Sequence, residues 1–538
     1  MALHFVVPTR YERSTNLSHS GQQCSIPSSF KFSYGTAGFR SKAEDLTFIA
    51  FRVGYLAGLR VMITASHNPA CDNGIKVVDP MGEMLAGEWE KLATDLVNQS
   101  DEEFPDAVRN LEKQILLPQD SSSAQIACAI DTRLSGPHLR EAIQAGASLL
   151  SSSGLGVKVA NHGILTTPQL HYIVRCVNDS SFGTPTEDGY YAKLSKAYNE
   201  LLEITPNAHQ AASLVLDCAN GVGAPSMRKL LTHLKENSLN ITFANEGGEL
   251  NHECGADFVK ISQNLPANLS NVDCAQKCAS FDGDADRLVY FRRVAKESDH
   301  VNLLDGDKIA VLLTKYIKEQ LDAARLTDQL SIGIVQTAYA NGASTKYIKE
   351  QLHVEPVCVP TGVKHLHHEA CNYDIGVYFE ANGHGTVTFS DKFKSLAHKD
   401  SSDDSVRRLY LISNVINEVV GDALADMLAV ELILRHFNWT TEDWEMKLYQ
   451  DVPNVQVKVP VTDRSIFKTN WAETQLLKPE DLQTKIDEAV LKINAIRSFV
   501  RPSGTENIVR VYAEATTMEL AKSLGEDIAA LVRSVSSQ

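Results

Sequence analysis

Three aspartates alternate with small residues in the segment Asp282-Gly-Asp-Ala-Asp-Arg287. Carboxylates at this spacing in a tight turn repel one another unless a cation lies between them, and a ligand set of oxygen atoms alone suits Mg²⁺. A calcium-binding EF-hand loop does not fit, because Arg287 and Arg293 stand where that loop needs Gly and Glu. The segment therefore predicts a site for one Mg²⁺ ion, with a solvated acidic turn between strands as the alternative.

A serine that could carry out covalent chemistry stands in the segment Thr64-Ala-Ser66-His-Asn-Pro69, directly after the apolar residues 61–63. A serine at the end of a strand, among small and polar residues, can be exposed as a nucleophile. The Gly-x-Ser-x-Gly pattern of hydrolases is absent, so we expect Ser66 to carry a phosphoryl group instead. A turn held by its own side-chain hydrogen bonds fits the segment equally well.

Two further segments could hold an anionic sugar. Arg501-Pro-Ser-Gly-Thr505, followed by Arg510, combines guanidinium groups, hydroxyls and a glycine that lets backbone N–H groups approach a phosphate. A capped turn with a surface arginine is the alternative. Glu380-Ala-Asn-Gly-His384 offers donors and acceptors that fit a polyhydroxylated ligand. Taken alone, that weaker pattern is better explained as a polar turn.

The elements that must position these loops follow an α/β pattern. Short apolar segments typical of buried strands alternate with segments of helical spacing, which predicts α/β units with mainly parallel sheets. The strands are expected at residues 126–130, 214–216, 331–335 and 375–379, and helices at 309–321 and 423–434. Strict alternation at Val455, Val457, Val459 and Val461 predicts a separate C-terminal α+β domain.

The connection that precedes the serine loop is unusually short. Residues 50–60 have the pattern of a helix and residues 61–64 that of a strand, with no turn residues between them. Such a connection normally takes about 2–6 residues. Either the helix unwinds at its C-terminal end, or the Ser66 loop is displaced.

Length and composition limit the function classes. The 538 residues predict three or four domains. A formal net charge of −16 argues against binding to nucleic acid or to an anionic membrane. We find no apolar run long enough to span a bilayer and no signal-peptide core near the N-terminus. Ten scattered cysteines indicate free thiols in a reducing cytosol, and residues 221–226 lack the glycine pattern of NAD-binding loops.

Taken together, the loops resemble the α-D-phosphohexomutase family. The motifs that carry the resemblance are Tyr34-Gly-Thr-Ala-Gly-Phe-Arg40, the serine loop 64–69, Asp72-Asn-Gly-Ile-Lys76, Asp131-Thr-Arg133, Thr166-Thr-Pro168, Asp217-Cys-Ala-Asn-Gly221, Cys254-Gly-Ala-Asp257, the aspartate loop 282–287, Thr361-Gly-Val-Lys364, the loop 379–385 and Arg501-Pro-Ser-Gly-Thr-Glu506. The forms of the serine loop, of 34–40 and of 379–385 are similar to the branch that acts on N-acetylglucosamine phosphate.

The resemblance implies four domains around a central cleft, three of them α/β with mixed sheets and the last α+β. Their expected bounds are 1–185 for the phosphoserine-loop domain, 186–298 for the metal-binding-loop domain, 299–445 for the sugar-binding-loop domain and 446–538 for the phosphate-binding domain. The catalytic residues implied are Arg40, Ser66, His67 and Arg287. The Mg²⁺ ligands implied are Ser66, Asp282, Asp284 and Asp286. The substrate-binding residues implied are Lys364, Glu380, Asn382, Gly383, His384, Arg501, Ser503, Gly504, Thr505 and Arg510.

The activity implied is that of a cytoplasmic isomerase, in which phosphoserine converts a hexose 6-phosphate to the 1-phosphate through a 1,6-bisphosphate. The expected substrate is N-acetylglucosamine phosphate, on the route to UDP-N-acetylglucosamine, with no obligate protein partner. A glucose or mannose phosphate mutase is one alternative. A non-catalytic sugar-phosphate binder, impaired by the short junction at residues 60–61, is the other. Asn507, where the family usually has Asp, is a minor departure.

Overall fold

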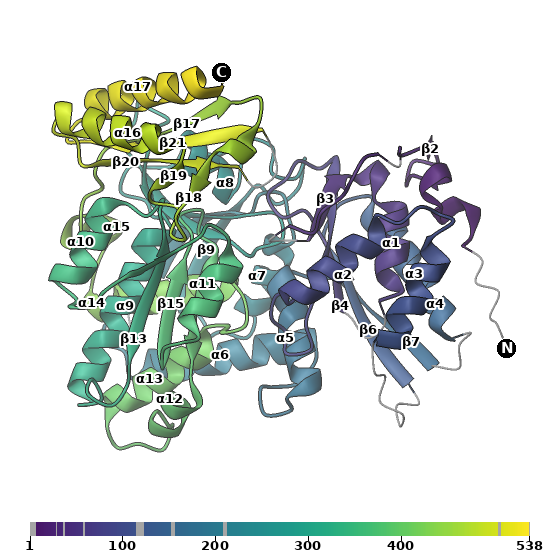
Figure 1. The fold of residues 1–538 in the computed structure, drawn as a ribbon. Helices are drawn as coiled ribbons and strands as arrows, with labels where there is room; N and C mark the ends of the chain where they lie inside the picture. Colours follow the sequence, from purple (N-terminus) through teal and green to yellow (C-terminus); the bar gives the residue numbers. More distant parts are fainter. Residues whose placement is uncertain are drawn as a thin grey trace. The chain divides into compact units, whose positions relative to one another are not determined.

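The computed structural model describes residues 7–27, 29–35, 38–56, 60–114, 123–151, 156–207, 212–503 and 507–536. The chain forms two compact units (Figure 1). The first consists of Met1–Leu303 with Asn414–Leu432, and the second of Leu304–Ser413 with Ile433–Gln538. Among the described residues, no helix has the length and apolar character needed to cross a lipid bilayer.

The first sheet of the first unit has the strand order β3-β5-β4-β6-β7. Its strands are β3 (Phe39–Lys42), β4 (Arg60–Ile63), β5 (Asp72–Val78), β6 (Ser123–Ile130) and β7 (Gly156–Ile164). Strands β4, β6 and β7 are parallel, whereas β5 is antiparallel to both of its neighbours. The accompanying helices are α1 (Thr47–Gly54), α2 (Gly87–Val97), α3 (Phe104–Gln114) and α4 (Gly136–Ser151), and the short elements before them are η1 (Thr9–Tyr11), η2 (Arg13–Thr15), β1 (Asn16–Leu17), β2 (Gln23–Cys24) and η3 (Ala43–Asp45).

Helix α1 ends earlier than the sequence pattern predicts. It stops at Gly54, and Arg60 already belongs to β4, paired with Val78 of β5. The prediction of a helix over residues 50–60 is therefore wrong at its C-terminal end. Glycine is needed at position 54, because a Cβ there would lie 2.2 Å from the carbonyl oxygen of Ile143 in α4. The chain leaves the helix after this close approach, and residues 57–59, including Leu59, lie outside the described part of the chain.

The second sheet of the first unit has the order β12-β11-β10-β8-β9. Its strands are β8 (Ala212–Asp217), β9 (Leu239–Ala244), β10 (Cys278–Phe281), β11 (Leu288–Arg293) and β12 (Val301–Leu304), and its helices are α5 (Thr167–Asn178), α6 (Glu187–Glu203), α7 (Gly223–Leu231) and α8 (Ala256–Ser262). Strand β10 is parallel to β8 and antiparallel to β11. The turn between β10 and β11 carries the three aspartates.

The larger sheet of the second unit has the order β14-β13-β15-β16. Its strands are β13 (Ile332–Thr337), β14 (Val357–Val359), β15 (Ile375–Phe379) and β16 (Gly385–Phe389). The helices of this part of the chain are α9 (Gly306–Ala323), α10 (Gly342–Glu350), α11 (Val363–Ala370), α12 (Asp391–Leu396), α13 (Asp404–Val415), α14 (Ala423–Phe437) and α15 (Thr441–Lys447). The end of α13 and most of α14 belong to the first unit, which includes Asn414–Leu432. Strands β13, β14 and β15 are parallel, and β16 returns antiparallel to β15.

An antiparallel sheet of order β17-β21-β20 forms the C-terminal part of the second unit. Its elements are β17 (Asn454–Pro460), η4 (Arg464–Ile466), β18 (Lys468–Thr469), β19 (Leu476–Lys478), α16 (Glu480–Lys492), β20 (Arg497–Pro502), β21 (Ile508–Glu514) and α17 (Met518–Ser536). Helices α16 and α17 cover one face of this sheet (Figure 1). Fully buried aliphatic residues fill the space between, among them Val459, Val511 and Leu524.

The predicted fold class is confirmed. Each strand expected from the apolar segments is present, although β6 begins at Ser123, earlier than expected. Mixed sheets alternate with helices, and the C-terminal part is α+β. The division into four domains at the expected bounds stays a prediction.

Candidate functional site

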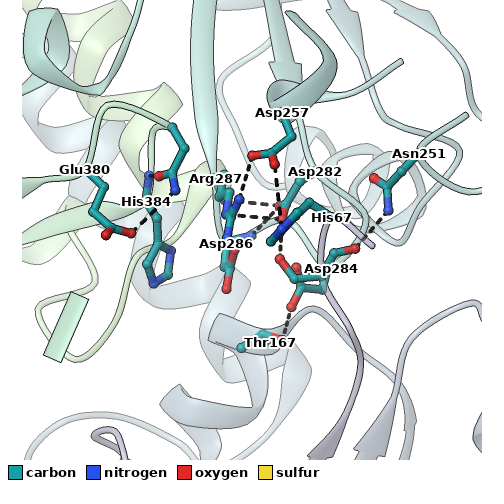
Figure 2. A network of polar contacts seen from close by, with 12 residues as sticks. His67, Thr167, Asn251, Asp257, Asp282, Asp284, Asp286, Arg287, Glu380 and His384 are labelled. Carbon is teal, nitrogen blue, oxygen red and sulfur yellow. Dashed lines mark hydrogen bonds and ion pairs between the residues drawn. The ribbon is translucent and has the colours of Figure 1, made fainter. Parts of the chain in front are cut away.

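The aspartate loop is folded tightly around its own first carboxylate. The backbone N–H groups of Asp286 and Arg287 donate to Asp282 Oδ1 over 3.1 and 3.2 Å, and Ala285 adopts a left-handed φ of 57°. As a result the three aspartates converge (Figure 2). One oxygen from each lies within 4.8 Å of the others, and all three side chains are buried.

The donor set fits a small divalent cation. Asp284 Oδ2 accepts a 2.6 Å hydrogen bond from Thr167 Oγ1, while Asp284 Oδ1 is buried and has no hydrogen-bond partner among the described residues. Burial, together with the charges of Asp286 and Asp284, raises the pKa of Asp282 well above its ordinary value. A hard cation between the carboxylates would remove this repulsion and use the remaining oxygen, so the residues present fit Mg²⁺.

The serine loop lies directly against the aspartates. Ser66 Oγ donates to Asp282 Oδ2 over 2.6 Å, and Ser66 is almost completely buried. The closeness depends on Gly283, because a Cβ there would lie 2.8 Å from the carbonyl oxygen of Ser66. Although β4 follows a short connection, it is in register with both β5 and β6. The loop therefore reaches the aspartates, and of the two expected alternatives, early termination of the helix is the one observed.

Hydrogen bonds within the serine loop and from two other segments hold Ser66 in an unusual conformation. Its φ is 51°, a left-handed value that costs a non-glycine residue roughly 1–2 kcal/mol. Its N–H donates to Thr64 Oγ1 over 2.9 Å, and Thr64 in turn donates to the buried Asp131. The Ser66 carbonyl oxygen accepts from Asn251 over 2.8 Å and from Arg133 over 3.2 Å. Strain maintained in this way is typical of a functional residue.

Positive groups surround the carboxylates. Arg287 Nη1 donates to Asp257 over 2.6 Å, and its Nε lies 3.8 Å from oxygens of both Asp282 and Asp286. Lys76 Nζ lies 3.9 Å from Asp286 Oδ2. Burial lowers the pKa of Lys76, although the nearby aspartates oppose this shift.

Arg40 and His67 complete this part of the site. Arg40 is largely desolvated, and its Nη1 donates to Asn68 over 3.3 Å. His67 Nε2 lies 3.6 Å from Asp257 Oδ2. Burial and the positive charge of Arg287 lower the pKa of His67 to about 3, so its imidazole is neutral near pH 7. The contact with Asp257 is then a long polar contact of a neutral ring and not an ion pair.

The predicted sugar loop is a closed turn between β15 and β16. Gly383 has a φ of 87° and donates its N–H to the carbonyl oxygen of Glu380 over 2.9 Å. Asn382 Nδ2 lies 3.4 Å from Glu380 Oε2, and the N–H of His384 donates to Asn382 Oδ1. Figure 2 shows the Glu380 and His384 side chains extending from this turn. Lys364 lies in the first turn of α11 and is buried.

The phosphate loop places two arginines side by side. Arg501 of β20 and Arg510 of β21 are directly opposite in the antiparallel register, so both side chains extend from one face of the sheet. Like charges in this position are destabilising without an anion between them. Ser503 is buried at the end of β20, whereas Gly504 and Thr505 lie outside the described residues.

The predicted site residues therefore form two groups, one in each unit. Arg40, Ser66, His67, Arg287 and the aspartates come together in the first, and the sugar and phosphate loops belong to the second. Other residues of the site were given no role from the sequence, namely Lys76, Asp131, Arg133, Thr167, Asn251 and Asp257. All but Asn251 fall within motifs of the resemblance, which is the signal that could have found them; for Asn251 we find no such signal.

Comparison with known proteins covers each part of this architecture. Residues 181–289 and 305–439 match the family descriptions "Phosphoacetylglucosamine mutase AMG1", domains II and III. Residues 36–104 and 457–531 match domain I and the C-terminal domain of "Phosphoglucomutase/phosphomannomutase". The phosphoacetylglucosamine mutase of Candida albicans is 43% identical in an alignment that covers 94% of this chain and 97% of that protein. The chain belongs to the phosphoacetylglucosamine mutase family.

Solved structures of the phosphoacetylglucosamine mutase family share the whole fold. The Aspergillus fumigatus N-acetylphosphoglucosamine mutase in complex with GlcNAc-6P and magnesium is 42% identical and has a TM-score of 0.88 to this chain. A serine-to-alanine variant of that enzyme, in complex with glucose 1,6-bisphosphate, has a TM-score of 0.87 and the same identity. Both alignments cover 99% of this chain and 100% of the relative.

Proposed function

We propose that this chain interconverts N-acetylglucosamine 6-phosphate and N-acetylglucosamine 1-phosphate, as a phosphoacetylglucosamine mutase in the synthesis of UDP-N-acetylglucosamine. The observation that carries the proposal is the 2.6 Å hydrogen bond between Ser66 Oγ and Asp282 Oδ2. It combines a strained, buried hydroxyl with a carboxylate cluster suited to Mg²⁺. Membership of the phosphoacetylglucosamine mutase family supports the choice of substrate.

The proposed reaction is two phosphoryl transfers. A hydroxyl oxygen of the sugar phosphate attacks the phosphorus of phosphorylated Ser66, the bond from Oγ to phosphorus breaks, and a sugar 1,6-bisphosphate is formed. The net movement of one proton is from the sugar hydroxyl to Ser66 Oγ. After the bisphosphate has reoriented, Ser66 Oγ attacks the phosphorus of the other phosphoryl group, and the bond from that phosphorus to the sugar oxygen breaks. The net movement of one proton is from Ser66 Oγ to the new sugar hydroxyl. The serine is phosphorylated again at the end of the cycle.

The roles of the surrounding residues follow from their charge. When bound, Mg²⁺ would offset the negative charge of Asp282, Asp284, Asp286 and the phosphoryl oxygens. Arg40 and Arg287 are positioned to stabilise charge on the transferred group, and the neutral His67 can donate a hydrogen bond to it. In these roles Arg40, Arg287 and His67 keep the same protonation state throughout the transfer.

The groups of the second unit would bind the parts of the substrate that do not react. We assign Arg501, Ser503, Gly504, Thr505 and Arg510 to the non-reacting phosphate, since the two opposed arginines place two positive charges on one face of the sheet. Lys364 and the turn residues Glu380, Asn382, Gly383 and His384 are assigned to the sugar.

We also place the enzyme in the cytoplasm, acting on a small-molecule sugar phosphate without nucleic acid or membrane as a partner. The ten cysteines are all free thiols, which is typical of a reducing compartment. The net charge of −16 disfavours polyanionic partners.

The test is intact-mass measurement of the purified protein together with a coupled turnover assay. We expect one phosphate on Ser66 and Mg²⁺-dependent turnover, and we expect Ser66→Ala to abolish both. Ser395→Ala, which changes an exposed serine in α12, is the matched control and should leave both unchanged. Full activity in Ser66→Ala would rule out the phosphoserine mechanism.

The same assay distinguishes the alternative functions. A higher kcat/KM for glucose or mannose phosphate than for N-acetylglucosamine phosphate would contradict the substrate assignment. Ligand binding without turnover, and without phosphate on Ser66, would identify a non-catalytic binder.

A further inference from the structure

Glu473 is a site residue candidate that no sequence motif singled out. It lies in the loop between β18 and β19, and its φ is 57°. Asn470 organises this loop, since its carbonyl oxygen accepts from the Glu473 N–H over 3.1 Å and its side-chain oxygen accepts from the Thr474 N–H over 2.9 Å. A left-handed conformation is uncommon for glutamate, and here it fixes the direction of the side chain.

One oxygen of Glu473 accepts three hydrogen bonds. Arg501 Nε donates to Oε2 over 2.6 Å, the Thr361 N–H over 2.9 Å and Thr361 Oγ1 over 2.7 Å. The side chains of Glu473 and Arg501 are 16% and 14% exposed. At this burial the charge-assisted bonds are stronger than a surface ion pair, because solvent screens them less.

The donors belong to two different functional loops of the second unit. Arg501 is the first residue of the phosphate loop, and Thr361 begins the segment Thr361-Gly-Val-Lys364. Gly362 has a φ of 130°, which few other residues would adopt, and α11 begins at the next residue. Glu473 therefore contacts the phosphate loop and, at Thr361, the residue two positions before α11 begins.

The bond to Arg501 also settles which part of the guanidinium can meet a ligand. Glu473 occupies Nε, which leaves the terminal nitrogens to meet a phosphate, and the Tyr339 hydroxyl also interacts with the guanidinium group. The negative charge of Glu473 offsets part of the repulsion between Arg501 and Arg510, which are directly opposite in the sheet. Glu473 thereby preorganises Arg501 for binding an anion.

We propose that Glu473 is a positioning residue, which fixes the Arg501 guanidinium and the Thr361 loop relative to each other so that they bind the substrate phosphate as one unit. The inference rests on the proposed function, in which Arg501 holds the phosphate that does not react. That phosphate is bound equally in the ground state and the transition state, so losing its alignment should raise KM and leave kcat nearly unchanged.

The test compares Glu473→Ala and Glu473→Gln with the control Glu488→Gln, which changes an exposed glutamate of α16. We expect Glu473→Ala to raise KM, and the calorimetric Kd of N-acetylglucosamine 6-phosphate, about ten-fold or more, as for the loss of a charge-assisted hydrogen bond. The KM and Kd of Glu473→Gln should lie between those of the wild type and of Glu473→Ala, because the amide oxygen can still accept from Thr361. The control should match the wild type.

Thr361→Val tests whether Glu473 couples the two loops. The double variant Thr361→Val with Glu473→Ala should bind no more weakly than Glu473→Ala alone, since both changes break the same link. If the losses of binding free energy in the two single variants added up in the double variant, the proposed coupling of the two loops by Glu473 would be wrong. A fall in kcat at unchanged KM, or a Kd unchanged in Glu473→Ala, would overturn the positioning role.

The outcome for Glu473 can be separated from that of the proposed function. Wild-type turnover and the phosphate on Ser66 test the function, whereas the Kd for inorganic phosphate in the wild type and in Glu473→Gln tests the inference without any turnover. Melting temperatures of all variants identify a fold defect, and if Glu473→Ala does not fold, Glu473→Gln carries the comparison.

Discussion

At the scale of single residues, the site depends on side chains that hold other side chains. Thr167 Oγ1 fixes one oxygen of Asp284, and the other oxygen, which has no hydrogen-bond partner among the described residues, can meet a cation. The Thr167 N–H also donates to the carbonyl oxygen of Asp284 over 3.2 Å. Thr167 lies at the start of α5, where Thr166 and Gln169 form a capping box. The helix end is therefore a rigid support for one metal ligand.

Removing that support should weaken metal binding. We expect Thr167→Val, which keeps the side-chain shape, to weaken Mg²⁺ binding by about ten- to a hundred-fold, as is typical when a residue that orients a metal ligand is lost. Calorimetric titration of the protein with Mg²⁺ measures this directly. Thr232→Val, at an exposed threonine after α7, is the control, and an unchanged Mg²⁺ affinity in Thr167→Val would contradict the role.

At the scale of elements, the N-terminus of α14 is hydrogen-bonded to the aspartate loop and supports it. The Ala423 N–H donates to the carbonyl oxygen of Ala285 over 3.1 Å. Asp422 precedes this helix and accepts hydrogen bonds from Tyr190 of α6 over 2.9 Å, from Asn417 over 3.0 Å and from the Ala425 N–H over 3.2 Å. A buried helix start thus connects α6 to the turn that carries the metal ligands.

This arrangement predicts a pH dependence of stability. Burial raises the pKa of Asp422 to about 6, above its value in the unfolded chain. The folded state therefore binds the proton more tightly, so this contribution to stability is full below about pH 4 and is lost as the pH rises through about 6. The size of the loss is about 3 kcal/mol for a shift of about two pKa units.

Asp422→Asn removes the titration of Asp422, because an amide keeps the acceptor and does not ionise. As the pH rises from about 4 to about 7, the melting temperature of the variant should increase relative to that of the wild type. Burial and the charge of Asp422 raise the pKa of Asp426 well above its ordinary value, so the comparison measures Asp422 together with its effect on Asp426. A difference that does not change with pH would contradict the assignment.

At the scale of the whole molecule, the chain does not build its units in sequence order. Residues 414–432 return to the first unit. Within this segment, Asp422 accepts a hydrogen bond from the Tyr190 hydroxyl. Glu431 accepts one from the Tyr290 hydroxyl over 3.1 Å and one from Lys277 over 2.5 Å. Without this segment, two buried tyrosine hydroxyls of the first unit would lose these acceptors.

A truncated protein should reveal this dependence. We expect residues 1–303 alone to be poorly soluble or to melt at a much lower temperature than residues 1–452, which keep the segment 414–432. Each buried hydroxyl left without an acceptor costs about 1–3 kcal/mol, and apolar surface is exposed as well. Circular dichroism and thermal melting compare the two proteins, and equal melting temperatures would contradict the prediction.

The sequence by itself determined the local features of this protein. The alternation of apolar segments predicted the strands and the α/β class, because burial on a sheet imposes that pattern on neighbouring residues. The aspartate spacing predicted the metal site, because those residues share one turn. The helix predicted over residues 50–60 extends too far, because α1 ends at Gly54, where the chain approaches Ile143 of α4. The residues of the helix alone do not encode that approach.

Only the tertiary structure decided which distant residues meet. Ser66 and Asp282 are separated by 216 residues and lie 2.6 Å apart, and Glu473 reaches Thr361 across 112 residues. Such contacts depend on strand register and on close approaches such as that at Gly283, which no local pattern encodes. The sequence therefore identified the chemical groups, and the packing of the sheets decided which of them act together.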